Sequence, residues 1–164
     1  MRSSSARGPL LLFLAWAVHD IEEALTFPQV CYRLAERTGR EWWRMDARQS
    51  WCAVGFMGGL IGVACLRGTR RGGQSRLYRL TVAGLEAHVG THVAASVLQR
   101  GYTPGVVTAL PVMWPGARLA ARDLTRHGWP LEPADYARGA AVLLPSAAAC
   151  HGLARAVGRT KAHG

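Results

Sequence analysis

A histidine and two glutamates lie close together near the N-terminus, in the sequence His19-Asp20-Ile21-Glu22-Glu23. They directly follow the apolar run 10–18, and if this run is helical the helix continues through them. Residues three and four apart share a helix face, so His19, Glu22 and Glu23 point in roughly the same direction. Such groups are costly to bury in a segment apolar enough to enter a bilayer, and in a membrane helix they indicate a functional site.

Two further histidines, His88 and His92, lie four residues apart in the apolar segment from Leu77 to Leu98. If this segment is helical, the two rings share one face, and small residues four positions before and after them favour close packing against another helix. Glu86 lies near the opposite face and is expected to make a different contact. Packing of the two faces would gather one cluster, which consists of His19, Glu22, Glu23, His88 and His92.

Three kinds of chemistry fit such a cluster. Imidazole and carboxylate groups are ligands for zinc, iron or manganese, and helical bundles build metal sites from facing helices. The same groups in a pocket of low dielectric constant also suit general acid–base catalysis, with Glu22 or Glu23 as the acid or base and His92 orienting it or relaying the proton. In the third interpretation the side chains only satisfy one another and hold the helices together.

Five apolar blocks, bracketed by arginines, predict the elements that position these side chains. The blocks run from Pro9 to Phe27, Trp51 to Leu66, Leu77 to Leu98, Pro104 to Ala117 and Gly139 to Val157. Pro28 is expected to end the first helix. Residues 29–50 are expected to lie on the membrane surface, and residues 118–138 are expected to form a polar connection.

Each block is shorter than the roughly 20 apolar residues of a typical membrane span, so a soluble helical bundle is the alternative. The membrane is favoured by a glycine-rich, uncharged second block, by the flanking arginines, and by tryptophans and tyrosines near the block ends. The sequence therefore predicts an all-α fold. The chain is expected to form a single membrane domain over residues 1–164. This domain is an integral membrane bundle of about five transmembrane helices, of which the fifth lies at about 139–157.

Charge and cysteine content argue against two other classes of protein. The net charge is +10, nearly all of it from arginine. No helix-turn-helix, zinc-finger or RNA-binding signature accompanies it, so no nucleic-acid partner is expected. The four cysteines form no CxxC pair and are expected to be small buried hydrophobic residues rather than zinc ligands or a redox pair.

The first apolar block imitates a signal peptide, because Arg2 and Arg7 precede it. The later apolar blocks indicate instead that it is the first of several membrane spans. Five spans put the termini on opposite sides, and the positive-inside rule places the N-terminus in the cytoplasm. We therefore expect an integral membrane protein of a bacterial cytoplasmic membrane.

Two motifs in this order resemble the HXXEE family of small membrane proteins. The first is His19-x-x-Glu22-Glu23, and the second is His92 followed by Tyr102-Thr103-Pro104-Gly105 at the start of the next helix. The resemblance covers about residues 10–120 and implies an integral membrane protein, but it implies no activity. The family often has asparagine where this chain has His88, a departure that strengthens the interpretation of two histidine ligands.

These observations predict a small membrane enzyme that acts on a lipophilic small molecule. His19, Glu22, Glu23 and His92 are the candidate catalytic residues, and the same residues with His88 are the candidate metal ligands. Cyclisation, isomerisation, hydrolysis and oxidation are all compatible with the cluster. The alternative is a non-enzymatic transporter-like or scaffold protein with a structural or proton-relay network. His151, in the fifth block, is a further candidate for the same pocket.

Overall fold

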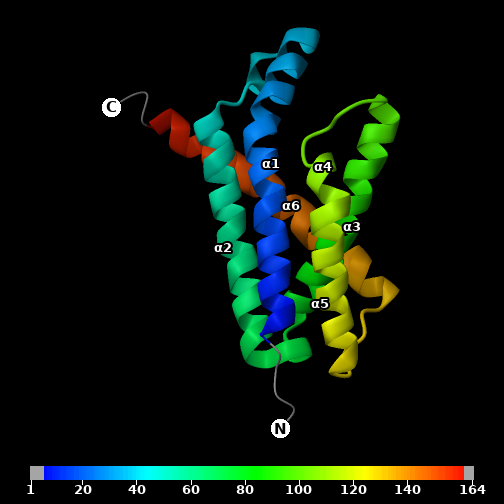
Figure 1. Ribbon diagram of the computed structural model, residues 1–164. Coiled ribbons are helices and arrows are strands. Elements are labelled where there is room, and N and C mark those ends of the chain that lie inside the picture. Colours follow the sequence, from blue (N-terminus) through cyan, green and yellow to red (C-terminus); the bar gives the residue numbers. More distant parts are fainter. Residues whose placement is uncertain (1–5, 161–164) are drawn as a thin grey trace.

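Five helical stretches make up the part of the chain that the computed structural model describes, residues 6–160, and this part contains no β-strand (Figure 1). This confirms the predicted all-α fold. The elements are α1 (Arg7–Thr38), η1 (Glu41–Trp43), α2 (Ala47–Arg71), η2 (Gly72–Gln74), α3 (Arg76–Gln99), α4 (Val106–Thr108), η3 (Ala109–Met113), α5 (Trp114–Arg126) and α6 (Pro133–Thr160). The helix α4, the π-helical turn η3 and α5 follow one another without a break and form the fourth stretch.

The first helix is longer than predicted, and the expectation that Pro28 ends it is wrong. The helix α1 continues through Pro28 to Thr38. A proline inside a helix removes one backbone hydrogen bond, but it leaves later turns free to form. Those turns bury Cys31 and Ala35, so packing continues beyond the proline. The helix ends where Gly39 adopts a left-handed conformation with φ of 65°, a common way to end a helix.

The predicted polar connection over residues 118–138 is also wrong, because most of it is helical. The helix α5 extends to Arg126, and α6 already begins at Pro133. Helical periodicity explains the extension of α5, because Ala117, Ala120, Ala121 and Leu124 form a buried face. Arg122 and Arg126 are exposed. Pro111 lies in the π-helical turn η3, which accommodates a residue that cannot donate a backbone hydrogen bond.

The helices α1, α2, α3 and α5 run roughly along the long axis of the molecule, and α6 crosses behind them (Figure 1). The helix α6 packs on both α2 and α3, while α1 packs on α2 and α5. Backbones come close where α6 crosses α3: a Cβ atom added to Gly84 would lie 2.8 Å from the carbonyl oxygen of Gly139. Small residues at this crossing therefore allow the close approach of the two helices.

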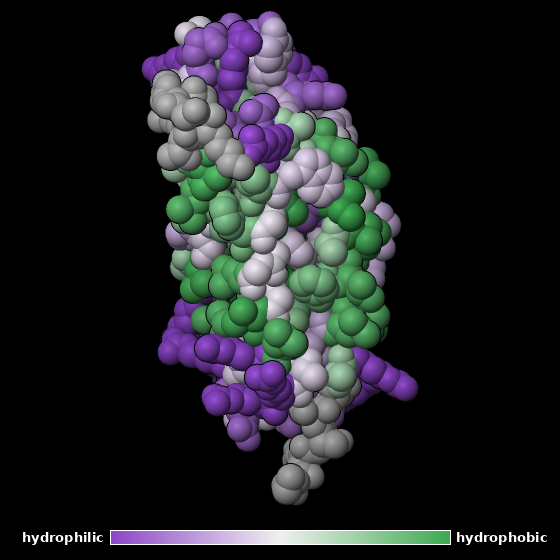
Figure 2. Space-filling model, turned by 90° about the vertical axis from the view of Figure 1, so that its left-hand side faces the viewer, coloured by the Kyte–Doolittle hydropathy of each residue, from purple (hydrophilic) through white to green (hydrophobic). Residues whose placement is uncertain are grey.

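On the face that Figure 2 shows, a band of mainly apolar side chains covers the middle of the molecule, with hydrophilic side chains at both ends. Large apolar side chains are exposed on every long helix, including Leu14 on α1, Phe56 on α2 and Leu144 on α6. Two stretches are long and apolar enough to cross a membrane, Ala47–Gln74 and Pro133–Gly158. The five predicted membrane spans stay a prediction.

Candidate metal centre

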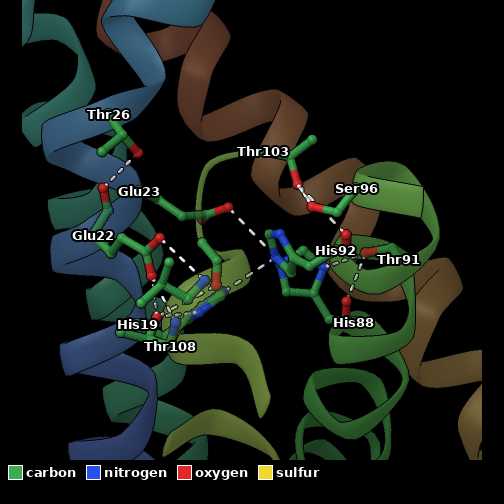
Figure 3. Close-up of polar contacts among 12 residues, drawn as sticks. His19, Glu22, Glu23, Thr26, His88, Thr91, His92, Ser96, Thr103 and Thr108 are labelled. Atoms are coloured by element: carbon green, nitrogen blue, oxygen red, sulfur yellow. Dashed lines mark hydrogen bonds and ion pairs between the residues drawn. The ribbon is translucent and has the colours of Figure 1, made fainter. Parts of the chain in front are cut away.

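Four side chains from α1 and α3 converge between these helices: His19, Glu23, His88 and His92 (Figure 3). One nitrogen or oxygen from each lies within 4.8 Å of those from all the others. The Nε2 atom of His92 is central, at 3.2 Å from Nε2 of His19, 2.8 Å from Nε2 of His88 and 3.5 Å from Oε1 of Glu23. Four of the five residues of the predicted cluster come together, whereas Glu22 does not join them. We call these four residues the His/Glu cluster below.

The orientation of His19 is set from the helix that follows α3. The hydroxyl of Thr108 donates a hydrogen bond to Oε2 of Glu22 at 2.6 Å, and Oγ1 of Thr108 lies 3.0 Å from Nδ1 of His19. Because the hydroxyl has only one proton, it must accept from His19, so Nδ1 of His19 carries the proton. A neutral imidazole has one N–H, and Nε2 of His19 therefore presents a lone pair to the cluster.

The other two rings are anchored in the same way. The hydroxyl of Thr91 donates to the carbonyl oxygen of His88 at 2.7 Å and lies 3.2 Å from Nδ1 of that ring. It can then only accept from Nδ1–H, which leaves the lone pair of His88 on Nε2. The ring of His92 hydrogen-bonds the backbone of Pro104, which has a carbonyl oxygen and no N–H, so this ring also donates outward.

This arrangement fits a cation better than it fits a set of hydrogen bonds. Unprotonated Nε2 atoms cannot hydrogen-bond one another, yet the cluster holds them 2.8 and 3.2 Å apart. A tetrahedral zinc ion with ligand bonds of about 2.0–2.1 Å separates its ligand atoms by about 3.3–3.4 Å. The distances around Nε2 of His92 lie close to this value. Small outward movements of the rings would therefore complete a site of three imidazoles and one carboxylate.

Glu22 lies outside the His/Glu cluster and binds the start of the fourth helical stretch instead. Its carboxylate accepts from the backbone N–H of Thr108 at 2.8 Å, from that of Val107 at 3.3 Å and from the hydroxyl of Tyr102 at 2.7 Å. Burial raises the pKa of Tyr102, so the phenol keeps the proton that it donates. A carboxylate at the first N–H groups of a helix is favourable. Glu22 therefore ties α1 to α4.

Gly105 covers the His/Glu cluster where the chain turns into α4. Its φ is 83°, a left-handed conformation that favours glycine. A Cβ atom at this position would lie 2.7 Å from Cε1 of His19 and 2.8 Å from Cε1 of His92. Sequence reasoning identified this segment as a turn and helix start, but it did not identify Gly105 and Thr108 as partners of the histidines. The only signal in the sequence was their place, since Gly105 ends the second motif and Thr108 follows three residues later.

An apolar cavity of about 290 Å³ lies beside the cluster, between α1, α2, α3 and α6. Glu23 and His88 form part of its wall, together with the mainly apolar side chains Trp16, Phe27, Met57, Leu85 and Leu143. His151 also lines this cavity but does not belong to the metal-binding group. Glu86 lies elsewhere, bound to Arg118 at 2.9 Å and to the hydroxyl of Tyr136 at 3.0 Å.

Comparison with known proteins adds one match. Residues 10–120 match the family described as "Protein of unknown function with HXXEE motif". The chain belongs to the HXXEE family. No curated protein and no solved structure matches it. In this HXXEE protein the motif divides into two parts, because its histidine and second glutamate belong to the His/Glu cluster, whereas its first glutamate binds α4.

Proposed function

We propose that this HXXEE protein is a small integral membrane enzyme that binds a divalent metal ion in the His/Glu cluster and acts on a lipophilic substrate in the adjoining cavity. The observation that carries the proposal is the convergence of three outward-anchored imidazoles and Glu23 at one wall of an apolar cavity. A metal held there meets a molecule in the cavity directly.

The outer surface supports a place in the membrane. Its apolar band is flanked by hydrophilic ends (Figure 2), and exposed leucines, valines and tryptophans are spread over all five helical stretches. Soluble proteins rarely expose apolar surface in one continuous patch of this kind. In a bilayer the same band would contact lipid. All five stretches would then cross the membrane, including α1, whose carboxylates point inward to α4 and the histidines.

The ligand set suits zinc, iron or manganese, which all accept imidazole and carboxylate. Such an ion supplies Lewis-acid or redox chemistry when bound. The chain's own contribution is to hold the rings: Thr108, Thr91 and the carbonyl of Pro104 anchor the nitrogens that face away from the cluster. Outer partners of this kind fix the orientation of metal-binding histidines and raise their affinity.

The cavity supports the class of substrate. Its volume of about 290 Å³ is near the lower end for small-molecule sites, and most of its lining is apolar. The lining suits an apolar molecule that enters from the bilayer, with its reacting part against Glu23 and His88. Cyclisation, isomerisation, hydrolysis and oxidation of such a molecule all fit this arrangement.

A proton relay is the second candidate, and one observation favours it. The polar contacts form a continuous chain from His88 through His92, His19 and Thr108 to Glu22. Without a metal, one added proton on an Nε2 atom would turn these ring contacts into hydrogen bonds, and such a chain suits proton movement in acid–base catalysis or in a transporter-like protein. The two candidates differ in whether the cluster binds metal.

Metal analysis of protein purified in detergent without chelators separates them. We expect about one equivalent of zinc, iron or manganese per chain in the wild type. His92→Ala and Glu23→Gln should lose it, whereas Glu36→Gln, a change at an exposed glutamate on the same helix, should keep it. Absence of metal, together with no uptake when each of the three ions is added back, would contradict the metal site and favour the relay.

A further inference from the structure

Asp20 is a buried carboxyl group in the same cavity, but it does not belong to the His/Glu cluster. Its exposed fraction is 7%, and the side chain of Trp16, whose indole N–H is its only donor, hydrogen-bonds it from one turn earlier in α1. It lines the cavity three residues before Glu23, which corresponds to a rise of about 4.5 Å along the helix. It therefore lies beside the place where a substrate would meet the metal.

The surroundings of Asp20 leave room for another hydrogen-bond partner. None of the described residues that line the cavity is a lysine or an arginine. A buried carboxyl group needs hydrogen bonds to offset its lost hydration, and one indole N–H leaves most of its acceptor sites unused. The free sites face a cavity that is otherwise mainly apolar. A polar group on a bound molecule would satisfy them.

Ser50 supplies a second polar group from the helix that faces Asp20. It is a residue of α2, its exposed fraction is 1%, and it lines the same cavity. A hydroxyl can donate one hydrogen bond and accept others, and the oxygens of a carboxyl group accept them. Together, Asp20 and Ser50 can accept a hydrogen bond from a ligand and donate one to it.

We propose that Asp20 and Ser50 bind a hydroxyl group on an otherwise apolar substrate, which they hold with its carbon skeleton beside the His/Glu cluster. The inference rests on the proposed function for the lipophilic nature of the substrate. A hydroxyl both donates and accepts, as this pair requires. An anionic head group would meet the carboxyl groups of Asp20 and Glu23 with no basic side chain on the described lining.

Brominated probes test the proposal, because bromine quenches tryptophan fluorescence on contact and Trp16 lines the cavity. The protein is placed in phosphatidylcholine nanodiscs and titrated with 10-bromodecan-1-ol and with 1-bromodecane, which lacks the hydroxyl. We expect the alcohol to bind about tenfold more tightly than 1-bromodecane, as one buried hydrogen-bonded group predicts. Trp16→Phe should remove most of the saturable quenching, which assigns the signal to the cavity.

Two variants locate the hydroxyl. Asp20→Leu and Ser50→Ala should each reduce the advantage of the alcohol over 1-bromodecane, and Asp20→Leu should abolish it. Retained binding of 1-bromodecane shows that each variant is folded. Ser146→Ala, at a serine whose hydroxyl binds its own helix, should change neither affinity.

Three results would overturn the inference: equal affinity of the two probes in the wild type, an advantage that persists in Asp20→Leu, or tighter binding of 10-bromodecylamine or 10-bromodecanoate than of the alcohol. The titration is run on metal-loaded and on chelator-treated protein. Loss of the alcohol's advantage in both forms of a protein that does bind metal refutes the hydroxyl site alone. If the alcohol binds more tightly than 1-bromodecane to a protein that never binds metal, the metal site alone is refuted.

Discussion

The Nδ1 atom of His19 lies 3.0 Å from Oγ1 of Thr108, whose hydroxyl donates to Glu22. This contact joins the first motif to a residue 89 positions later in the sequence, three residues beyond the end of the second motif. It also determines which nitrogen of His19 faces the cluster. The start of the fourth helical stretch therefore serves as an outer support for a site whose four possible ligands come from α1 and α3.

Thr108→Val should weaken metal binding without removing a ligand. Valine has nearly the same shape but cannot accept from Nδ1–H, so His19 is free to present either nitrogen to the cluster. Loss of such an outer partner typically costs about 10- to 100-fold in metal affinity. Competition with a chromophoric chelator measures this change. Thr108→Ser keeps the hydroxyl and should stay within about threefold of the wild type, and equal affinity of both variants would contradict the role of the hydroxyl.

The two glutamates of the motif should differ in what their loss does. Glu23→Gln removes a ligand and should abolish stoichiometric metal. Glu22→Gln replaces a carboxylate that accepts from Thr108 and Tyr102 with a weaker neutral acceptor, so the variant should bind metal less tightly and melt at a lower temperature. Metal content and thermal unfolding in detergent are measured on both. Complete metal loss in Glu22→Gln with full occupancy in Glu23→Gln would reverse these assignments.

Gly105→Ala should damage both stability and metal binding. The left-handed backbone costs a non-glycine residue about 1–2 kcal/mol, and the added Cβ would lie 2.7 Å from Cε1 of His19. Thermal unfolding and chelator competition report the two effects. The control is Gly101→Ala in the same loop, where the added atom meets nothing closer than 3.7 Å. Equal melting temperatures and metal affinities of the two variants would show that a side chain at position 105 does not displace the histidines.

Leu14→Arg tests whether the helical bundle lies in a membrane. The side chain of Leu14 is 52% exposed on α1. In water, a charge at an exposed site changes stability by no more than about 0.5 kcal/mol. In the middle of a bilayer it costs roughly 2.5–3.5 kcal/mol. The amount of variant that remains in membranes after a carbonate wash should therefore fall sharply, while Glu36→Arg at the end of the helix leaves it unchanged. Normal yield of soluble Leu14→Arg would refute the membrane bundle.

The sequence predicted the order of the five helical stretches because each apolar block overlaps one of them. The block from Leu77 to Leu98 differs from α3 by one residue at each end, since Ser75 caps the helix and polar residues follow it. The extension of α1 beyond Pro28 could not be predicted from composition. It depends on the burial of Cys31 and Ala35, which only the tertiary contacts of the helix provide.

The candidate site was predictable in part because its residues lie on helices that the sequence predicted. Helical spacing alone aligned His19 with Glu23 and His88 with His92, and the cluster unites them. Spacing could not separate Glu22 from Glu23, because both lie on the inner side of α1. The distinction arises from the loop that brings Thr108 beside Glu22. Asp20 faces the cavity because α2 and α6 enclose that side of α1, a packing that no local pattern encodes.

X-ray absorption spectroscopy of metal-loaded protein tests the central claim most directly. We predict three imidazole nitrogens and one carboxylate oxygen around a zinc ion at about 2.0–2.1 Å. His88→Ala should lower the imidazole number to two, and His127→Ala, outside the cluster, should leave the spectrum unchanged. A metal surrounded by water or sulfur, or an imidazole number that does not change in His88→Ala, would contradict the metal site formed by His19, Glu23, His88 and His92.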